Sequence, residues 1–221
     1  VTPFSGDEML RADARKVVSD GSNQGRSGYF MQPYLGEDNG GKADYTPETL
    51  RAALRAALDD GWQVMTHTNG DAAVEFVLEA MEELLPAYGT TDLRHRLEHC
   101  SFTTDDQLTR IAAAGLSVSF LMNHVYYWGA AFRDTILGPA RAGRLDRVAS
   151  AYKAGLAPSL HSDYNVTAVH PLLSARTAVL RQTKADGQVL NAAECATPAQ
   201  ALAAITTNAA WQIHADDRGT L

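Results

Sequence analysis

The sequence predicts an α/β fold, because segments typical of strands and of helices alternate along the chain. Short apolar runs that end at polar residues recur between longer segments whose apolar residues repeat every three to four positions. The longer segments also carry helix-boundary residues: the one that begins at Thr46 has Pro47 in its first turn and stops at Gly61. Such alternation is typical of a parallel sheet covered by helices.

Five strands are predicted along the chain. They comprise residues 15–18, 62–67, 93–99, 116–121 and 156–160. Helices are predicted at residues 46–61, 72–85, 104–115, 139–153, 171–181 and 197–207. Residues 21–41 and the aromatic segment after residue 121 are predicted to be loops. Five strands are too few for an eight-stranded barrel, which usually needs about 250 residues, so the sheet is either open or part of a larger barrel.

The composition is that of one globular domain. The 221 residues are 45% apolar and 20% charged. The net charge of -7 argues against nucleic acid and anionic membranes as partners, since both bind basic surfaces. Cys100 and Cys195 match no disulfide framework or zinc motif, and we interpret them as reduced thiols. No apolar run approaches the roughly 20 residues of a membrane span, and a cytoplasmic location is favoured, with no readable targeting signal.

Four polar residues are associated with the carboxyl ends of predicted strands. They are Lys16, His67, His99 and Asp163. Taken singly, each has an ordinary interpretation: a histidine there often only makes hydrogen bonds, and an aspartate after a strand often caps a helix. In a parallel α/β fold, however, the carboxyl ends of the strands open on one face. Imidazole nitrogens and carboxylate oxygens that meet there would suit zinc, iron or manganese.

Five motifs stand in a fixed order along the chain. They are Lys16–Gly25, His67–Ala73, His95–Cys100, His124–Gly129 and His161–Thr167. Together they resemble the amidohydrolase superfamily, specifically its family-3 branch, which contains N-substituted formamide deformylase. The resemblance implies a (β/α)8 TIM-type barrel. Residues 1–221 would form one partial barrel domain with strands four to eight, without strands one to three and without the flanking small β-domain.

The resemblance also implies a metal-dependent hydrolase that cleaves non-peptide C–N bonds of a small molecule. His67, His99 and Asp163 would be ligands of one or two divalent ions, most simply zinc, and Asp163 would also take the proton from the attacking water. Lys16 matches a lysine that is often carboxylated in relatives with two metal ions, because a carbamate supplies two oxygen ligands.

Further residues are expected around this site. His124, Tyr127 and Trp128 follow the fourth strand of this chain and are predicted to line the substrate pocket. His161 is expected either to face substrate or to support a ligand. Strand alternation relative to His99 predicts that the residues at 96 and 98 lie outside the barrel.

Two alternatives remain open at the level of sequence. The His-x-His pair of the family's first strand is absent from these residues, so the chain could be a non-catalytic barrel fragment or a binding module. A Schiff-base lyase with Lys16 as nucleophile is also conceivable, but it leaves the histidines without a role. In either case, a partial barrel would expose sheet edges and is expected to form a homo-oligomer.

Overall fold

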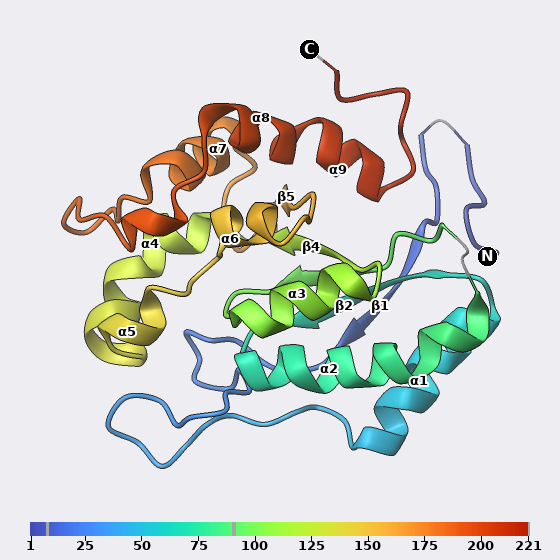
Figure 1. Ribbon diagram of the computed structural model, residues 1–221, viewed down its shortest axis with the longest axis horizontal. Coiled ribbons are helices and arrows are strands. Elements are labelled where there is room, and N and C mark those ends of the chain that lie inside the picture. The colour runs from blue at the N-terminus through green and yellow to red at the C-terminus, as the bar shows by residue number, and fades with distance from the viewer. Residues whose placement is uncertain (8, 90–91, 221) are drawn as a thin grey trace.

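The computed structural model describes residues 1–7, 9–89 and 92–220. Its strands form one parallel sheet in chain order, which confirms the predicted alternation (Figure 1). The strands are β1 (Ala14–Val18), β2 (Gln63–Thr68), β3 (Arg96–His99), β4 (Ser117–Phe120) and β5 (Ser159–Leu160). The fifth strand is shorter than predicted, because only its last two residues pair with β4.

Helices alternate with the strands along the chain. They are α1 (Pro47–Asp59), α2 (Asp71–Leu84), α3 (Asp105–Ala113), α4 (Asn123–Ala131), α5 (Pro139–Ala142), α6 (Val148–Lys153), α7 (Pro171–Leu180), α8 (Pro198–Ile205) and α9 (Thr207–Gln212). Helices α1, α2 and α3 cover one face of the sheet, and α8 and α9 lie on its other side (Figure 1). Short 3-10 turns lie at Leu85–Tyr88 and Ala192–Glu194, and a π-helical turn lies at Phe132–Ile136. None of the described helices is long and apolar enough to cross a lipid bilayer.

Two predicted elements were wrong. The aromatic segment after β4 is helix α4 and the π-helical turn, and not a loop. No side chain caps the start of α4, so the usual boundary signal is missing and burial against the core stabilises the helix instead. The predicted helix at 139–153 is divided into α5 and α6, with Asp146 in a left-handed conformation (φ 46°) between them.

The two faces of the sheet differ in polarity. Strand residues that pack toward the helices are apolar and buried, as are Val17, Val64, Leu97 and Val118. The alternate positions lie on the opposite side, which we call the inner face, and most of them are polar. They include Lys16, Gln63, His67, Glu98, Ser117, Ser119 and Ser159. The inner face therefore offers polar groups to a ligand rather than an apolar core.

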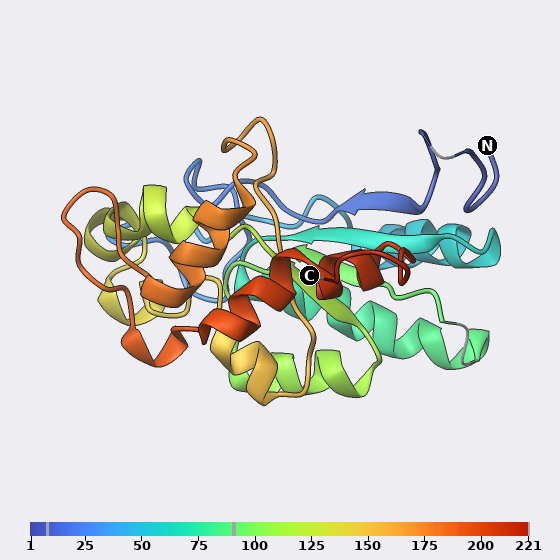
Figure 2. The same cartoon turned by 90° about the horizontal axis from the view of Figure 1, so that it is seen from above.

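Helix α9 closes the amino end of the inner face. The side chain of Gln212 donates to the carbonyl of Val118 at 2.9 Å and accepts from the hydroxyl of Ser159 at 2.6 Å. Its backbone carbonyl accepts from the side chains of Gln63 and Arg96. Seen from above, α9 lies beside the strands (Figure 2). Because α9 occupies the amino end of the inner face, a ligand site is expected at the opposite, carboxyl end of the strands.

The buried His95 makes stability sensitive to acid. Its Nδ1 accepts the backbone N–H of Val64 at 2.9 Å, and burial lowers its pKa to about 4. The unfolded chain binds a proton near pH 6.5, so stability from this group is complete above pH 6.5 and is lost as the pH falls toward 4. The total loss is about 3 kcal/mol.

We expect His95→Asn, which keeps a hydrogen-bond acceptor but does not titrate, to make stability less dependent on pH. The urea concentration at the unfolding midpoint should then change less between pH 7 and 4.5 than it does in the wild type. An unchanged pH dependence would contradict this.

Candidate active site

Two of the predicted ligands meet at the carboxyl ends of neighbouring strands. His67 lies on β2 and His99 ends β3, and their ring centroids are 4.4 Å apart with the planes at 74°. The ring of His161, in the turn after β5, lies 5.0 Å from that of His99. The sheet order therefore brings together three imidazoles that are far apart in the sequence.

The backbone at the end of β3 turns His99 toward the inner face. His99 and Cys100 both have a left-handed conformation, with φ of 66° and 47°. Regular alternation would place His99 on the same side as Leu97, which packs among the buried apolar residues under the helices. The left-handed residue interrupts that alternation, so His99 lies beside His67 instead.

The prediction that Arg96 and Glu98 lie outside the barrel was therefore wrong. Arg96 contacts the sulfur of Met65 and pairs with Glu98. Glu98 is almost fully buried, and its Oε2 lies 3.9 Å from Nε2 of His161. Both residues thus lie on the inner face, where their charges help to define the floor of the site.

A buried carboxylate that the sequence did not single out organises the loops around His67. Asp20 accepts backbone N–H groups from Tyr29, Asn69 and Gly70, at 2.8 to 3.0 Å. Its Oδ1 also lies 3.4 Å from Nε2 of His67. Asp20 therefore joins the glycine-rich loop to the loop that follows β2. The only sequence signal was its place within the first motif.

The amide of Asn69 completes this support. Its Nδ2 lies 3.0 Å from Nε2 of His67 and donates to the carbonyl of Gly21, while its Oδ1 accepts from Ser101. Gly70 allows the close approach of the two loops, since a Cβ there would lie 1.8 Å from the carbonyl oxygen of Tyr29.

Lys16 and Asp163 lie at the open side of the site. Both residues are exposed as a whole, although the ammonium end of Lys16 has lost part of its solvent. The pKa of Lys16 is lowered, mainly by loss of solvent around its ammonium group, while the nearby charges of Glu98 and Asp163 oppose this effect. Asp163 lies in the turn after β5 with φ of 47°, and its carbonyl accepts from Val166. The negative charge of Asp163 acts to raise the pKa of His67 and of His161, against the larger opposite effect of their burial.

The donor chemistry fits a divalent ion, but the coordination sphere is incomplete in this arrangement. Burial lowers the pKa of His67 and of His99, so both are neutral at pH 7, as a metal ligand must be. Nδ1 of His99 is buried and finds no hydrogen-bond partner within residues 1–7, 9–89 and 92–220. Within the part of the chain that the structure describes, no three His, Cys, Asp or Glu side chains form a group that could hold an ion. The predicted ligand set thus stays a prediction.

The predicted pocket residues lie on helix α4 and beside it. His124 is buried, its Nε2 lies 2.7 Å from Nε2 of Gln24, and burial lowers its pKa to about 3. Tyr127 and Trp128 are partly exposed and line a cavity of about 480 Å³ together with Val166 and the two residues after it.

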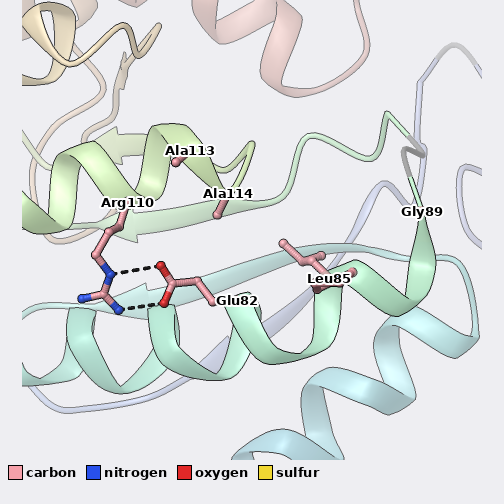
Figure 3. Close-up of a pocket in the computed structure, with 7 residues that line it drawn as sticks. Glu82, Leu85, Gly89, Arg110, Ala113 and Ala114 are labelled. Carbon is pink, nitrogen blue, oxygen red and sulfur yellow. Dashed lines mark hydrogen bonds and ion pairs between the residues drawn. The ribbon is translucent and has the colours of Figure 1, made fainter.

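Another cavity lies far from this chemistry. It has a volume of about 380 Å³ and lies between α2 and α3, where Arg110 pairs with Glu82 beside Leu85 (Figure 3). It belongs to the helical layer outside the sheet and contains none of the predicted site residues.

Comparison with known proteins identifies relatives over most of the chain. The model of the amidohydrolase family matches residues 2–221. A Bacillus subtilis (strain 168) protein, YtcJ, which is named as an amidohydrolase, is 28% identical over 91% of this chain and 38% of its own length. N-substituted formamide deformylase of Arthrobacter pascens is 31% identical over 72% of this chain and 29% of its own length.

The fold is that of a solved metal-dependent hydrolase of uncharacterised activity from Pyrococcus horikoshii OT3. The TM-score is 0.85 at 24% identity, over all of this chain and 44% of that one. The chain thus spans less than half the length of these relatives. The likeness confirms the predicted fold class, a (β/α)8 barrel of which this chain supplies a part.

Proposed function

The chain belongs to the amidohydrolase family, and we propose that its protein is a metal-dependent hydrolase of non-peptide C–N bonds in small molecules, of amide or formamide type. The observation that carries the proposal is the contact between His67 and His99 at the carboxyl ends of β2 and β3. The similarity to an N-substituted formamide deformylase supports the type of bond.

His67, His99 and Asp163 would hold one or two divalent ions, with Lys16, in carboxylated form, as a further ligand. Imidazole and carboxylate ligands suit zinc. When bound, such an ion supplies a Lewis acid that lowers the pKa of water from 15.7 to about 7.

The chain's own residues would then move the proton. Asp163 would take it from the attacking water and return it to the leaving nitrogen. Its exposed position after β5 allows it to reach a substrate over the inner face. His124, held by Gln24, and His161, beside Glu98, would position the substrate.

We also propose that residues 1–221 form one partial barrel domain, with strands four to eight, and that strands one to three and a small β-domain complete the protein. We further propose a homo-oligomer that acts on small molecules; the acidic net charge argues against nucleic acid and membranes as partners.

Metal removal tests the function. We expect a chelator to abolish amide hydrolysis by the full-length protein, and zinc or manganese to restore it. His99→Ala should lower the bound metal by at least tenfold, whereas His214→Ala, which replaces a histidine packed on Phe4, should not. Hydrolysis that survives complete metal removal would contradict the proposal.

Two further outcomes would favour the alternative functions. Borohydride trapping of a substrate on Lys16 would favour the lyase. A metal-free protein that binds ligands without hydrolysing them would favour the binding module.

A further inference from the structure

The cavity beside the candidate site is apolar. We call it the apolar pocket; its lining residues are Tyr127, Trp128, Ala131, Val166, Thr167 and Ala168. Its volume of about 480 Å³ is in the range of small-molecule sites. Three of its large side chains are substantially exposed: Tyr127 (39%), Trp128 (41%) and Val166 (58%). No charged residue lines it.

Both walls of the apolar pocket belong to segments that carry candidate site residues. On α4, His124 precedes Tyr127 by three positions and Trp128 by four, so all three lie along adjoining parts of the helix surface. The opposite wall is the turn that carries Asp163, where the carbonyl of Asp163 accepts the N–H of Val166 at 2.6 Å. The apolar pocket therefore lies between two segments that each carry candidate site residues.

Hydrogen bonds fix the two walls relative to each other. The hydroxyl of Thr167 donates to the carbonyl of Ser162 at 2.6 Å and accepts from Nδ2 of Asn123, at the start of α4, at 3.1 Å. Asn123 is fully buried. This bridge makes the apolar pocket a preformed feature, which costs a ligand little ordering free energy.

We propose that the apolar pocket binds an uncharged aliphatic or aromatic substituent of the substrate, next to the C–N bond that is cleaved. This inference rests on the proposed function and adds the substrate class to it. Burial of the exposed aromatic rings and of Val166 would favour an apolar group. A charged group would lose its hydration against this uncharged lining. Nζ of Lys184, 5.2 Å from the ring of Tyr127, disfavours a positively charged group in particular.

A series of N-alkylformamides tests the substrate class. For N-methyl-, N-butyl- and N-hexylformamide, kcat/KM of the metal-loaded, full-length protein should rise at least tenfold from the first to the last. Trp128→Ala should remove most of this rise with chain length, while Trp128→Phe should retain it. Leu202→Ala, which removes an exposed apolar side chain from α8, is the control and should behave as wild type.

A binding measurement separates failure of this inference from failure of the proposed function. Calorimetry with hexan-1-ol and with the more polar hexane-1,2,6-triol requires no turnover. If no formamide is hydrolysed but hexan-1-ol binds at least tenfold more tightly than the triol, and Trp128→Ala removes that difference, the hydrolase proposal fails and the apolar pocket stands. If formamides are hydrolysed with no dependence on chain length, or with the same dependence in Trp128→Ala, the inference is overturned. Equal binding of the two alcohols would also overturn it.

Discussion

Replacement of Asp163 by asparagine is expected to lower kcat for amide hydrolysis by about 10²- to 10⁴-fold, the range that one positioned acid–base group contributes. Asparagine retains a carbonyl oxygen that can still contact an ion, but it cannot take up a proton at pH 7. The side chain is exposed and makes no ion pair in the described parts of the chain. The loss should therefore appear in kcat, with little change in the melting temperature or in metal content.

The matched control is Asp38→Asn, which changes an exposed carboxylate in the glycine-rich loop. Because it lowers the net negative charge by the same amount, it separates local chemistry from a general electrostatic effect. Steady-state kinetics and metal analysis of both variants give the comparison. Full turnover in Asp163→Asn, or an equal loss in Asp38→Asn, would remove Asp163 from its proposed role.

The sequence was sufficient to place the strands and the residues at their ends. The position of a strand is a local property of the sequence, since each apolar run ends where polar residues begin. Strands β1 to β4 accordingly lie within the predicted segments or extend them by one residue. Parallel order then makes the ends of β2 and β3 adjacent, which is why the sequence alone predicts that His67 and His99 lie together.

The inner face could not be assigned correctly in the same way. The prediction for Glu98 assumed that β3 alternates regularly through His99, whereas a left-handed His99 has no local sequence signal of the kind that glycine provides. Helix α4 was missed for a related reason: it has no capping residue and few polar positions, and its stability comes from packing against distant parts of the chain.

The support around His67 was also beyond the reach of pattern analysis. Asp20 is 47 residues away from His67 in the sequence and acts through three backbone N–H groups, which every residue except proline carries. Such bonds depend on how two loops meet, and the close contact of Gly70 with Tyr29 shows how tightly they do.

The second large effect concerns stability. Arg181 follows α7 and is fully buried, and its guanidinium donates to the carbonyls of Leu145, Asp146 and Leu190 at 2.7 to 2.9 Å. The carboxylate of Asp146 is also buried, and among the described residues neither of its oxygens has a hydrogen-bond partner. Burial raises the pKa of Asp146, while the charge of Arg181 opposes that rise.

We expect Arg181→Met to destabilise the fold by about 3–5 kcal/mol, because it leaves three carbonyls and a buried acid without their cation.

Arg176→Met is the control, since Arg176 is an exposed residue of α7 itself and should change stability by less than about 0.5 kcal/mol. In a chain of this size, the loss at Arg181 corresponds to a fall of roughly 10 °C in the melting temperature. The double variant Arg181→Met with Asp146→Asn discriminates further. If the buried charge of Asp146 is a large part of the cost, the second substitution should recover part of the stability. Equal melting temperatures for Arg181→Met and Arg176→Met would contradict this prediction. In that case the three carbonyl groups find other donors, and the guanidinium of Arg181 does not hold α7 to the segment between α5 and α6.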